Sequence, residues 1–580
     1  MKREQPDRYN QDLFIAIILA VSCFSFFQFF FKYHLFFKEE IQLFLFTTDY
    51  FLSYLKKPGW LAAYLGDFLT QFFYLRGGGA VLISLILLLE WRLIVRWLRS
   101  LGLYSHTSLF ALFPIVIEWV LHTTLGYSLT SSVGFIFVLA TCLLLGNVVG
   151  KWWSYVLIVC TIPLFYALIG GYMLFLPVYL LLNDLSKQKG IVFADILLIV
   201  LFAVYPYIVR SYYVITVRQA YLLPGMSRTV YYSGLALLFI SWTVFFKFTH
   251  THTFRRKALW PLIIGLFLLL GAGLWQKADF RQEKILSLSV EGYFNRWDKV
   301  YQLATENELS NTLASYYTNI ALSKSGRLPD ELLNFYQPAS QALFLPLHTA
   351  TPWIWIFSGS DVFFHIGDMN MAQHAAMLGQ IFSPNHRSSR MVKRLAEVNL
   401  VNGDSTATLK YLRMLDQTLF HRDWAIRRKE MLTDSTNTWL QDKRKQIAVH
   451  DTLRLAGDDM TSLKLLIESN SENKEALDYL LCYCLVNKDI RSFVDIFDQY
   501  CKGQQLRMPA LYGEALLIHL AVSKASQEEL ESYKIPANFV TDFMAYTRAY
   551  EQYGAQMEPL REKYGKTYCF YYHFAQMKNE

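Results

Sequence analysis

The first 275 residues consist mainly of apolar runs that are each about as long as a membrane is thick. A helix crosses a hydrocarbon core of about 30 Å with roughly 20 residues, and most of these runs are about 17 to 20 residues long. A chain of 580 residues with 53% hydrophobic content is too long and too apolar for one soluble domain. The sequence therefore predicts an all-α protein that begins with a polytopic transmembrane helical domain, residues 1–275, of about nine spans.

The predicted spans follow one another closely. They are Leu13–Phe31, Gly78–Ile94, Leu109–Leu125, Val133–Val149, Trp153–Ile169, Tyr172–Leu185, Ile191–Ile208, Tyr231–Phe248 and Pro261–Trp275. The fifth and sixth share the turn Gly170-Gly171, so residues 153–185 form either two spans or one broken helix. The first run is too long for a signal peptide and ends without a small-residue cleavage site, which predicts a retained span.

Basic residues in the short connections predict the orientation, because Lys and Arg concentrate on the cytoplasmic side. With two spans counted around Gly170-Gly171, one side collects Lys2, Arg3, Arg8, Arg92, Arg96, Arg99, Lys151, Lys187, Lys189, Arg255, Arg256 and Lys257. The N-terminus is then cytoplasmic. The connection 32–78 and the C-terminal half share the outer face, which is the periplasm of a Gram-negative cell.

The long first outer loop, residues 32–78, combines many aromatic side chains with a few carboxylates. This pattern is typical of helices that lie on a membrane surface. Glu39, Glu40 and Asp49 are the candidate catalytic residues, since a carboxylate can act as a general base. The alternative is that each belongs to an ordinary solvated helix face.

A late outer connection, residues 209–229, opposes the orientation rule because it carries Arg210, Arg218 and Arg228. The three arginines need partners, and the candidates are first-loop carboxylates, lipid headgroups or an anionic ligand such as a phosphate. The alternative is that they snorkel to headgroups. Glu118 and His122, near the outer end of the third span, are supporting candidates, because an ionisable group at that depth marks a functional site by default. The alternative for Glu118 is that it pairs with an Arg and only holds helices together.

Metal ligands do not gather in the sequence. Cys482 and Cys484 point in different directions on a helix, and no His is placed to complete a zinc site. We expect no cofactor and no metal in the site, although a divalent metal stays open.

Residues 276–580 have the pattern of paired helices. Gly367-Asp368 and Gly403-Asp404 stand 36 residues apart, and each pair precedes an Ala-containing helix. A period in the mid-thirties is typical of tetratricopeptide (TPR) repeats, so we expect a TPR-like α-solenoid. The concave face of such a solenoid usually binds a peptide or another subunit, and the alternative is a spacer. We expect a protein partner and no nucleic acid.

An opening span, a long first outer loop with an acidic pair, partly broken helices and a helical C-terminal domain on the same face resemble the GT-C class of polyprenyl-phosphate-sugar-dependent glycosyltransferases. In that class a first-loop carboxylate is the base or a metal ligand, and late-loop basic residues hold the lipid-linked phosphate. The resemblance implies Glu39 and Glu40, with Asp49 as second choice, for the first role. It implies Arg210, Arg218 and Arg228 for the second role.

The chain as a whole, including Tyr33 to Glu40 and Lys57 to Trp60, also resembles an uncharacterised Bacteroidota family of multi-pass membrane proteins with a TPR-like tail. This resemblance implies a bacterial inner membrane and no particular activity. Three functions are therefore open: a GT-C-like glycosyltransferase that uses a polyprenyl-phosphate-linked sugar, a non-enzymatic TPR-like scaffold for envelope assembly, or an O-antigen ligase or polymerase-like enzyme.

Overall fold

The computed structural model describes residues 5–103, 106–145, 152–186, 192–222, 228–248, 259–348, 350–434, 436–447, 458–503, 507–554 and 556–576. All regular elements in these ranges are helices, which confirms the predicted all-α class for this part of the chain. The chain forms two compact units. Unit 1 contains Met1–Glu283 with Gln417–Phe420, and unit 2 contains Lys284–Asp416 with His421–Glu580.

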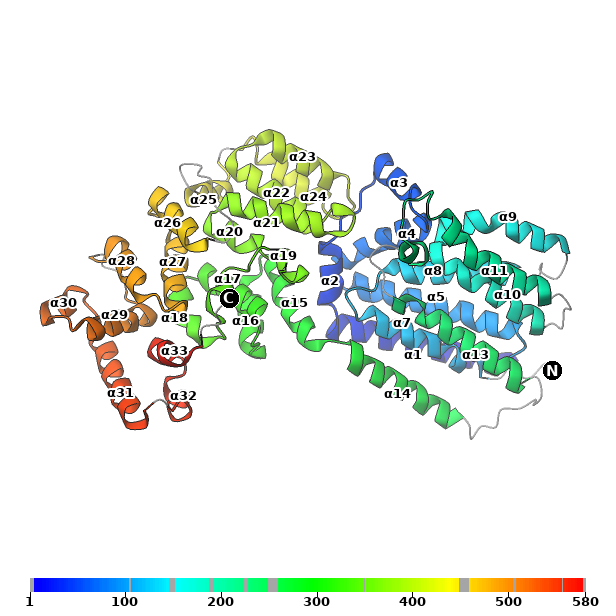
Figure 1. Cartoon of the computed structure of the whole chain (residues 1–580), viewed down its shortest axis with the longest axis horizontal. Coiled ribbons are helices and arrows are strands. Elements are labelled where there is room, and N and C mark those ends of the chain that lie inside the picture. Colours follow the sequence, from blue (N-terminus) through cyan, green and yellow to red (C-terminus); the bar gives the residue numbers. More distant parts are fainter. Residues whose placement is uncertain are drawn as a thin grey trace. The chain divides into compact units, whose positions relative to one another are not determined.

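Unit 1 is a bundle of long helices joined by short ones, and its labelled helices α1, α5, α7 and α13 run side by side (Figure 1). Its elements are α1 Gln5–Ser25, η1 Phe26–Phe30, α2 Tyr33–Glu40, α3 Thr48–Leu55, α4 Trp60–Thr70, η2 Gln71–Tyr74, α5 Gly78–Ser100, α6 Thr107–Phe110, α7 Leu112–His122, α8 Leu129–Leu145, α9 Trp152–Ile169, η3 Gly170–Leu174, α10 Phe175–Ser186, α11 Val192–Val209, α12 Val217–Tyr221, η4 Arg228–Tyr231, α13 Tyr232–Phe248, α14 Leu259–Lys277 and the start of α15 Phe280–Tyr293. A helix is present at each of the nine positions where a span is predicted.

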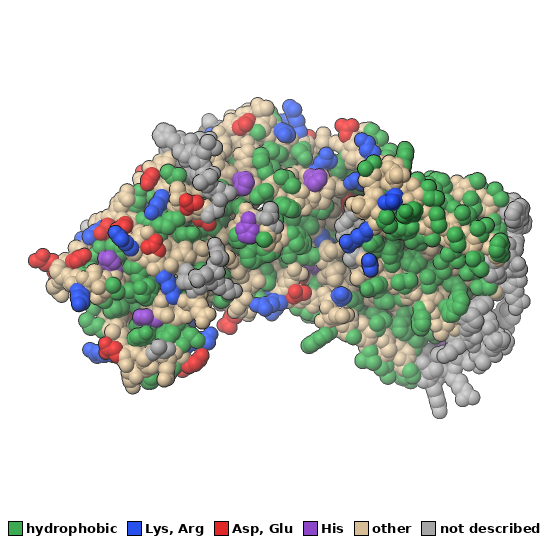
Figure 2. Space-filling model, viewed as in Figure 1, with side chains coloured by type: hydrophobic (Ala, Val, Ile, Leu, Met, Phe, Trp, Pro, Cys, Tyr) green, Lys and Arg blue, Asp and Glu red, His purple; other side chains and the backbone are tan. Residues whose placement is uncertain are grey.

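Four helical segments of the described residues are long and apolar enough to cross a membrane, which is fewer than the nine predicted spans. They are Asn10–Phe30, Gly78–Ser100, Tyr155–Leu185 and Trp260–Lys277. Apolar side chains also face outward, as in Leu85, Phe193 and Phe267, which are 57%, 81% and 71% exposed. Figure 2 shows such hydrophobic side chains covering the visible face of these helices. An apolar surface of this extent indicates contact with lipid or protein rather than water.

The segment Tyr155–Leu185 contains two helices and not one. Tyr155, near the start of α9, donates its hydroxyl to Asp184, near the end of α10, at 2.9 Å. In one continuous helix these residues would be about 44 Å apart, because each residue adds 1.5 Å. The chain therefore reverses at η3, around Gly170-Gly171, and α9 and α10 run in opposite directions.

Most of the basic residues that predict the orientation fall outside the part of the chain that the structure describes. These are Lys2, Arg3, Lys151, Lys187, Lys189, Arg255, Arg256 and Lys257. The orientation of unit 1 in a membrane therefore stays a prediction.

Unit 2 is a succession of short helices around one apolar core, whose largest buried side chains include Tyr316, Tyr317 and Tyr479. Its helices after α15 are α16 Trp297–Asn307, α17 Thr312–Lys324, α18 Leu328–Glu331, η6 Leu332–Asn334, η7 Ala339–Ala342, α19 Trp353–Ile356, α20 Ser360–Ile366, α21 Met369–Phe382, η8 Pro384–His386, α22 Ser389–Asn402, α23 Ser405–Asp416, α24 Arg422–Glu430, α25 Thr438–Gln446, α26 Asp459–Ser469, α27 Lys474–Val486, α28 Ile490–Tyr500, α29 Ala510–Ser523, α30 Gln527–Ser532, α31 Ala537–Tyr553, α32 Glu558–Tyr564 and α33 Tyr568–Phe574.

Three turns of unit 2 share one geometry. They are Gly367-Asp368, Gly403-Asp404 and Lys488-Asp489. The first residue of each turn has a positive φ of 93°, 82° or 59°. The Asp side chain then accepts a hydrogen bond from the backbone N–H three residues later, at 3.1, 2.8 and 3.0 Å. Each turn thus combines a left-handed helix end with an Asp N-cap. The turns recur as expected from a repeat, while the TPR-like solenoid itself stays a prediction.

Two of these glycines differ in the space around them, which gives a test of the packing of unit 2. A Cβ at Gly367 would lie 2.3 Å from the carbonyl oxygen of Gln446, whereas the nearest atom to a Cβ at Gly403 is 4.0 Å away. Gly403→Ala should cost about 1–2 kcal/mol through the left-handed backbone alone. Gly367→Ala should cost clearly more, because the backbone at Gln446 must also move. Calorimetric unfolding of the two purified variants measures the difference, and equal destabilisation would show that the Gln446 contact is unimportant.

Candidate functional site

Helix α2 carries two buried basic side chains on one face. His34 and Lys38 are one turn apart and only 2% and 8% exposed. The backbone N–H groups of Tyr33 and His34 donate to the Glu283 carboxylate at 2.5 and 3.0 Å. A carboxylate at a helix N-terminus satisfies free N–H groups and interacts favourably with the helix dipole. Glu283, at the start of α15, therefore fixes where α2 begins.

The same face of α2 binds the end of α7. Lys38 Nζ donates to the carbonyl oxygens of His122 at 3.4 Å and Tyr127 at 3.0 Å. The His34 Nε2 atom lies 2.9 Å from the His122 carbonyl oxygen. Because a carbonyl oxygen only accepts, Nε2 carries a proton and donates it in this hydrogen bond. Carbonyls at a helix C-terminus lack partners inside the helix, and a cation there is stabilised by the dipole. Helix α2 thus supplies hydrogen-bond donors to the free carbonyl oxygens at the C-terminal end of α7.

The Lys38 amine has a lowered pKa because it is buried. Burial lowers the pKa of Lys38 to about 7, and the Glu283 carboxylate opposes this shift. Burial also lowers the pKa of His34, again opposed by hydrogen bonding and charge from Glu283. An amine that changes protonation near pH 7 is able to act as a general acid or base. Lys38 is therefore a further acid–base candidate in the loop 32–78.

Glu118 is the centre of a buried hydroxyl cluster. The Tyr127 hydroxyl lies 2.8 and 2.7 Å from its two carboxyl oxygens, the Ser132 hydroxyl donates at 3.2 Å, and the Ser233 hydroxyl also donates. His122 Nε2 lies 3.0 Å from Ser132 Oγ and 3.8 Å from Glu118. Glu118 and His122 are each 1% exposed. The structure thus brings these two predicted residues together, with partners from α7, α8 and α13.

The other predicted site residues are not joined in this way. Glu39 and Glu40 are 4% and 1% exposed, so they do not present carboxylates to solvent, whereas Asp49 does. Arg210 is half-buried and lies over the Tyr207 ring, 4.8 Å from its centroid. Arg218 and Arg228 are exposed. Among the described residues, no ion pair of these three arginines is found, and their roles and those of the carboxylates stay predictions.

The first loop and the late connection both bond to Tyr166 of α9. The N–H of Gly59, just before α4, donates to the carbonyl oxygen of Tyr166 at 3.0 Å. The hydroxyl of the same Tyr166 donates to the carbonyl oxygen of Ala220 in α12 at 3.0 Å. The segments that carry the predicted carboxylates and arginines are therefore anchored to one residue of α9, at the same end of unit 1.

Sequence reasoning missed Lys38, His34, Tyr127, Ser233 and Glu283, whose roles depend on contacts between distant parts of the chain. It also missed Glu90, which lies in α5 and is 0% exposed. A signal for Glu90 existed, since a carboxylate inside a long apolar run meets the same criterion as Glu118. Within the described ranges, no group of three or more His, Cys, Asp and Glu side chains could hold a metal ion.

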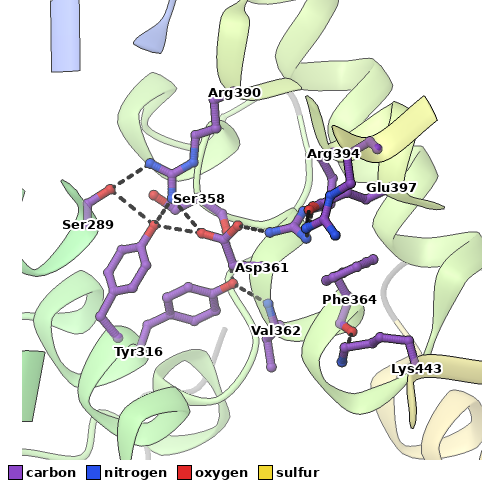
Figure 3. A network of polar contacts seen from close by, with 12 residues as sticks. Ser289, Tyr316, Ser358, Asp361, Val362, Phe364, Arg390, Arg394, Glu397 and Lys443 are labelled. Atoms are coloured by element: carbon purple, nitrogen blue, oxygen red, sulfur yellow. Dashed lines mark hydrogen bonds and ion pairs between the residues drawn. The ribbon is translucent and has the colours of Figure 1, made fainter. Parts of the chain in front are cut away.

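Unit 2 contains a separate buried charge network, drawn in Figure 3. Asp361 accepts from Arg390 at 2.5 Å and from Arg394 at 2.9 Å, and Glu397 accepts from Arg394 at 3.1 Å and from Arg428 at 2.8 Å. Burial alone would raise the pKa of Asp361, but the charges and hydrogen bonds of the two arginines hold this pKa below its usual value. Because Asp361 and Glu397 already engage these arginines, the network stabilises unit 2 rather than forming an open anion site.

Comparison with known proteins adds one finding. A family described as "Family of unknown function (DUF6057)" matches residues 8–575. No curated protein matches the chain, and no solved structure matches it.

Removing the charge of Asp361 should destabilise unit 2. Asp361→Asn leaves Arg390, which is 3% exposed, without its carboxylate, and breaking one partner of a buried pair costs about 3–5 kcal/mol. Since the folded pKa of Asp361 lies below the unfolded value of about 4, the wild-type contribution is complete above that pH. It is lost as the pH falls through the folded pKa, so the variant should lose less stability in acid.

The matched control is Asp442→Asn, whose partner Lys445 lies at 3.2 Å with both side chains at least 70% exposed. A surface pair of this kind contributes about 0–1 kcal/mol. Chemical denaturation at neutral and acid pH measures both variants. Similar losses for the two substitutions would contradict a stabilising role of the buried network.

Proposed function

The chain belongs to the DUF6057 family, and we propose that it is an integral inner-membrane protein with GT-C-like glycosyltransferase activity. In this proposal unit 1 spans the membrane nine times and uses a polyprenyl-phosphate-linked sugar at its periplasmic face. The N-terminus is cytoplasmic and unit 2 is periplasmic.

The membrane part of the proposal is supported by the surface and the connectivity of unit 1. Many of its outward-facing side chains are apolar, while Glu90, Glu118 and His122 inside the apolar helices are buried, which is the arrangement required in lipid. The reversal at η3 makes α9 and α10 separate helices, so the nine proposed spans are α1, α5, α7, α8, α9, α10, α11, α13 and α14. Nine crossings would put the two ends of the bundle on opposite faces, as the proposed topology requires.

The observation that carries the transferase proposal is the meeting of two loops at Tyr166. Gly59 of the first loop and Ala220 of the late connection both bond to this residue. Arg218 and Arg228 are exposed at the same end and have no ion pair among the described residues. Arg grips phosphate through two parallel N–H bonds, so these side chains fit the phosphate of a lipid-linked sugar.

The proposed reaction needs an acceptor hydroxyl, a base and an anion site. The base removes the hydroxyl proton as the oxygen bonds to the anomeric carbon. The bond from that carbon to the phosphate oxygen breaks, and the lipid phosphate leaves with the electron pair while the arginines stabilise its charge. Asp49 is the solvent-exposed carboxylate for the base role, whereas Glu39 and Glu40, earlier in the same loop, are buried. Lys38, with its pKa lowered to about 7, supplies a second acid–base group.

A second candidate function is a membrane-anchored scaffold for envelope assembly. It is favoured by the three turns of unit 2 with the same Asp-capped geometry, which support a TPR-like repeat. A repeat surface of this kind binds a protein partner. In the transferase proposal the same surface selects the acceptor, whereas in the scaffold proposal it is the whole function.

Loss of one late-loop arginine should weaken phosphate binding. Arg218→Ala removes a charge-assisted contact worth about 1.5–3 kcal/mol, so the affinity for polyprenyl phosphate should fall by about 10- to 100-fold. Native mass spectrometry of the purified chain with added polyprenyl phosphate measures this change. Arg96→Ala is the control, because Arg96 is also exposed but lies about 27 Å along α5 from Gly78, toward the other end of the bundle.

If the control loses as much affinity as Arg218→Ala, the binding is a non-specific attraction to basic residues. Unchanged binding in Arg210→Ala, Arg218→Ala and Arg228→Ala would exclude the late connection as the phosphate site and leave the scaffold as the better proposal. Transfer of a radiolabelled sugar from the lipid, abolished by Asp49→Asn with insertion intact, would separate the enzyme from the scaffold.

A further inference from the structure

Glu90 is the most isolated ionisable side chain that the structure describes in unit 1. It lies in the middle of α5, within the apolar segment Gly78–Ser100, and is 0% exposed. Neither of its carboxyl oxygens has a hydrogen-bond partner among the described residues. A carboxylate in such surroundings loses the free energy of hydration with nothing in exchange.

Glu118 lies close enough to Glu90 for the two carboxyls to interact electrostatically. Its environment is the opposite of that of Glu90, because the hydroxyls of Tyr127, Ser132 and Ser233 all bond to it. Hydroxyl donors favour the ionised form of a carboxyl, and their absence disfavours it. The negative charge of the pair therefore belongs on Glu118 and the proton on Glu90.

Among the described residues, no positively charged side chain bonds to Glu90. In the same part of the chain, Glu118 of α7, Tyr127 of the α7–α8 connection and Tyr172 of η3 interact electrostatically with Glu90, and His122 lies beside Glu118. Lys38 is directed to the carbonyls of His122 and Tyr127. Two like charges at short range in an apolar interior cannot both be ionised, so the pair holds one proton.

A chain of polar atoms leads from the pair toward the end of unit 1. Ser132 Oγ lies 3.2 Å from Glu118 Oε2 and 3.0 Å from His122 Nε2, so this hydroxyl is able to accept from one neighbour while it donates to the other. The backbone of His122 is in turn bonded to His34 and Lys38 of α2. The side-chain path from the buried carboxyls thus ends at the His122 imidazole, and Lys38 lies beside the backbone of the same residue.

We propose that Glu90 and Glu118 form a proton-binding site inside the helical bundle, which takes up and releases one proton through Ser132 and His122. Carboxyls that serve only to hold two helices together would bond to each other or to a hydroxyl, and Glu90 does neither. A metal ion is a poorer fit, since no group of three or more metal-ligating side chains occurs in the described residues. The proposal goes beyond the transferase and does not depend on it.

The protonation of Glu90 can be tested with dicyclohexylcarbodiimide, which reacts with protonated carboxyls in apolar surroundings. The full-length chain in lipid nanodiscs is treated over a range of pH, and mass spectrometry of its peptides reads the adducts. We expect an adduct on Glu90 at neutral pH, none on the exposed Asp49, and loss of the Glu90 adduct as the pH rises. Absence of the Glu90 adduct at every pH would overturn the proposal.

The sharing of the proton is tested by Glu118→Gln. Without the neighbouring charge, Glu90 is ionised more easily, so the pH at which half of the adduct is lost should fall by about one unit or more. An unchanged midpoint would overturn the shared site. If this variant does not accumulate, the wild-type profile still decides the matter, because a Glu90 ionised at neutral pH gives no adduct there.

The path is tested by Ser132→Ala, with the adjacent buried Ser131→Ala as the matched control. After a pH step, the infrared carbonyl band of the protonated carboxyl, assigned by its loss in Glu90→Gln, should reappear at least several-fold more slowly in Ser132→Ala. The band itself should keep its final intensity, which separates a slowed path from a damaged site. Equal rates in both serine variants would exclude Ser132 as the path.

Discussion

The cost of burying charge is the constraint on which the arrangement of this protein depends. An ionised group without partners is far less stable inside an apolar interior than in water, so each buried charge needs a polar neighbour placed with it. In unit 1 the Glu283 carboxylate bonds to the start of α2, and Lys38 of the same helix bonds to the end of α7. In unit 2 Asp361 and Glu397 engage three arginines. These directional contacts fix the orientation of the helices, which the non-directional hydrophobic effect does not specify.

The same constraint separates structural groups from functional ones. Asp361 has its charge balanced by Arg390 and Arg394, so its network explains stability without calling for a ligand. Glu90 has no such partner among the described residues, and this absence is what points to a proton. Arg218 and Arg228 are a third case, since water reaches them and an anionic ligand is able to do so as well. The proposed phosphate site and the proposed proton site therefore rest on different observations.

Two processes at one end of unit 1 are compatible with each other. In the proposed transferase the loops anchored at Tyr166 provide the surface for a lipid-linked substrate, while the proposed proton path from Glu90 leads through Ser132 to His122. The two proposals are nevertheless independent, because each has its own residues and its own test.

Much of the local structure follows from the sequence by itself. The apolar runs determine nine helical positions, and Gly followed by Asp determines the turns at Gly367 and Gly403, because periodicity and capping act within a few residues. The reversal at Gly170-Gly171 was left open by the sequence and required the bond between Tyr155 and Asp184. Only the tertiary structure decided that Glu39 and Glu40 are buried and that Lys38 titrates near neutrality. The physical reason is distance along the chain: His34 meets Glu283 across 249 residues, and no local pattern encodes the partner that such packing brings.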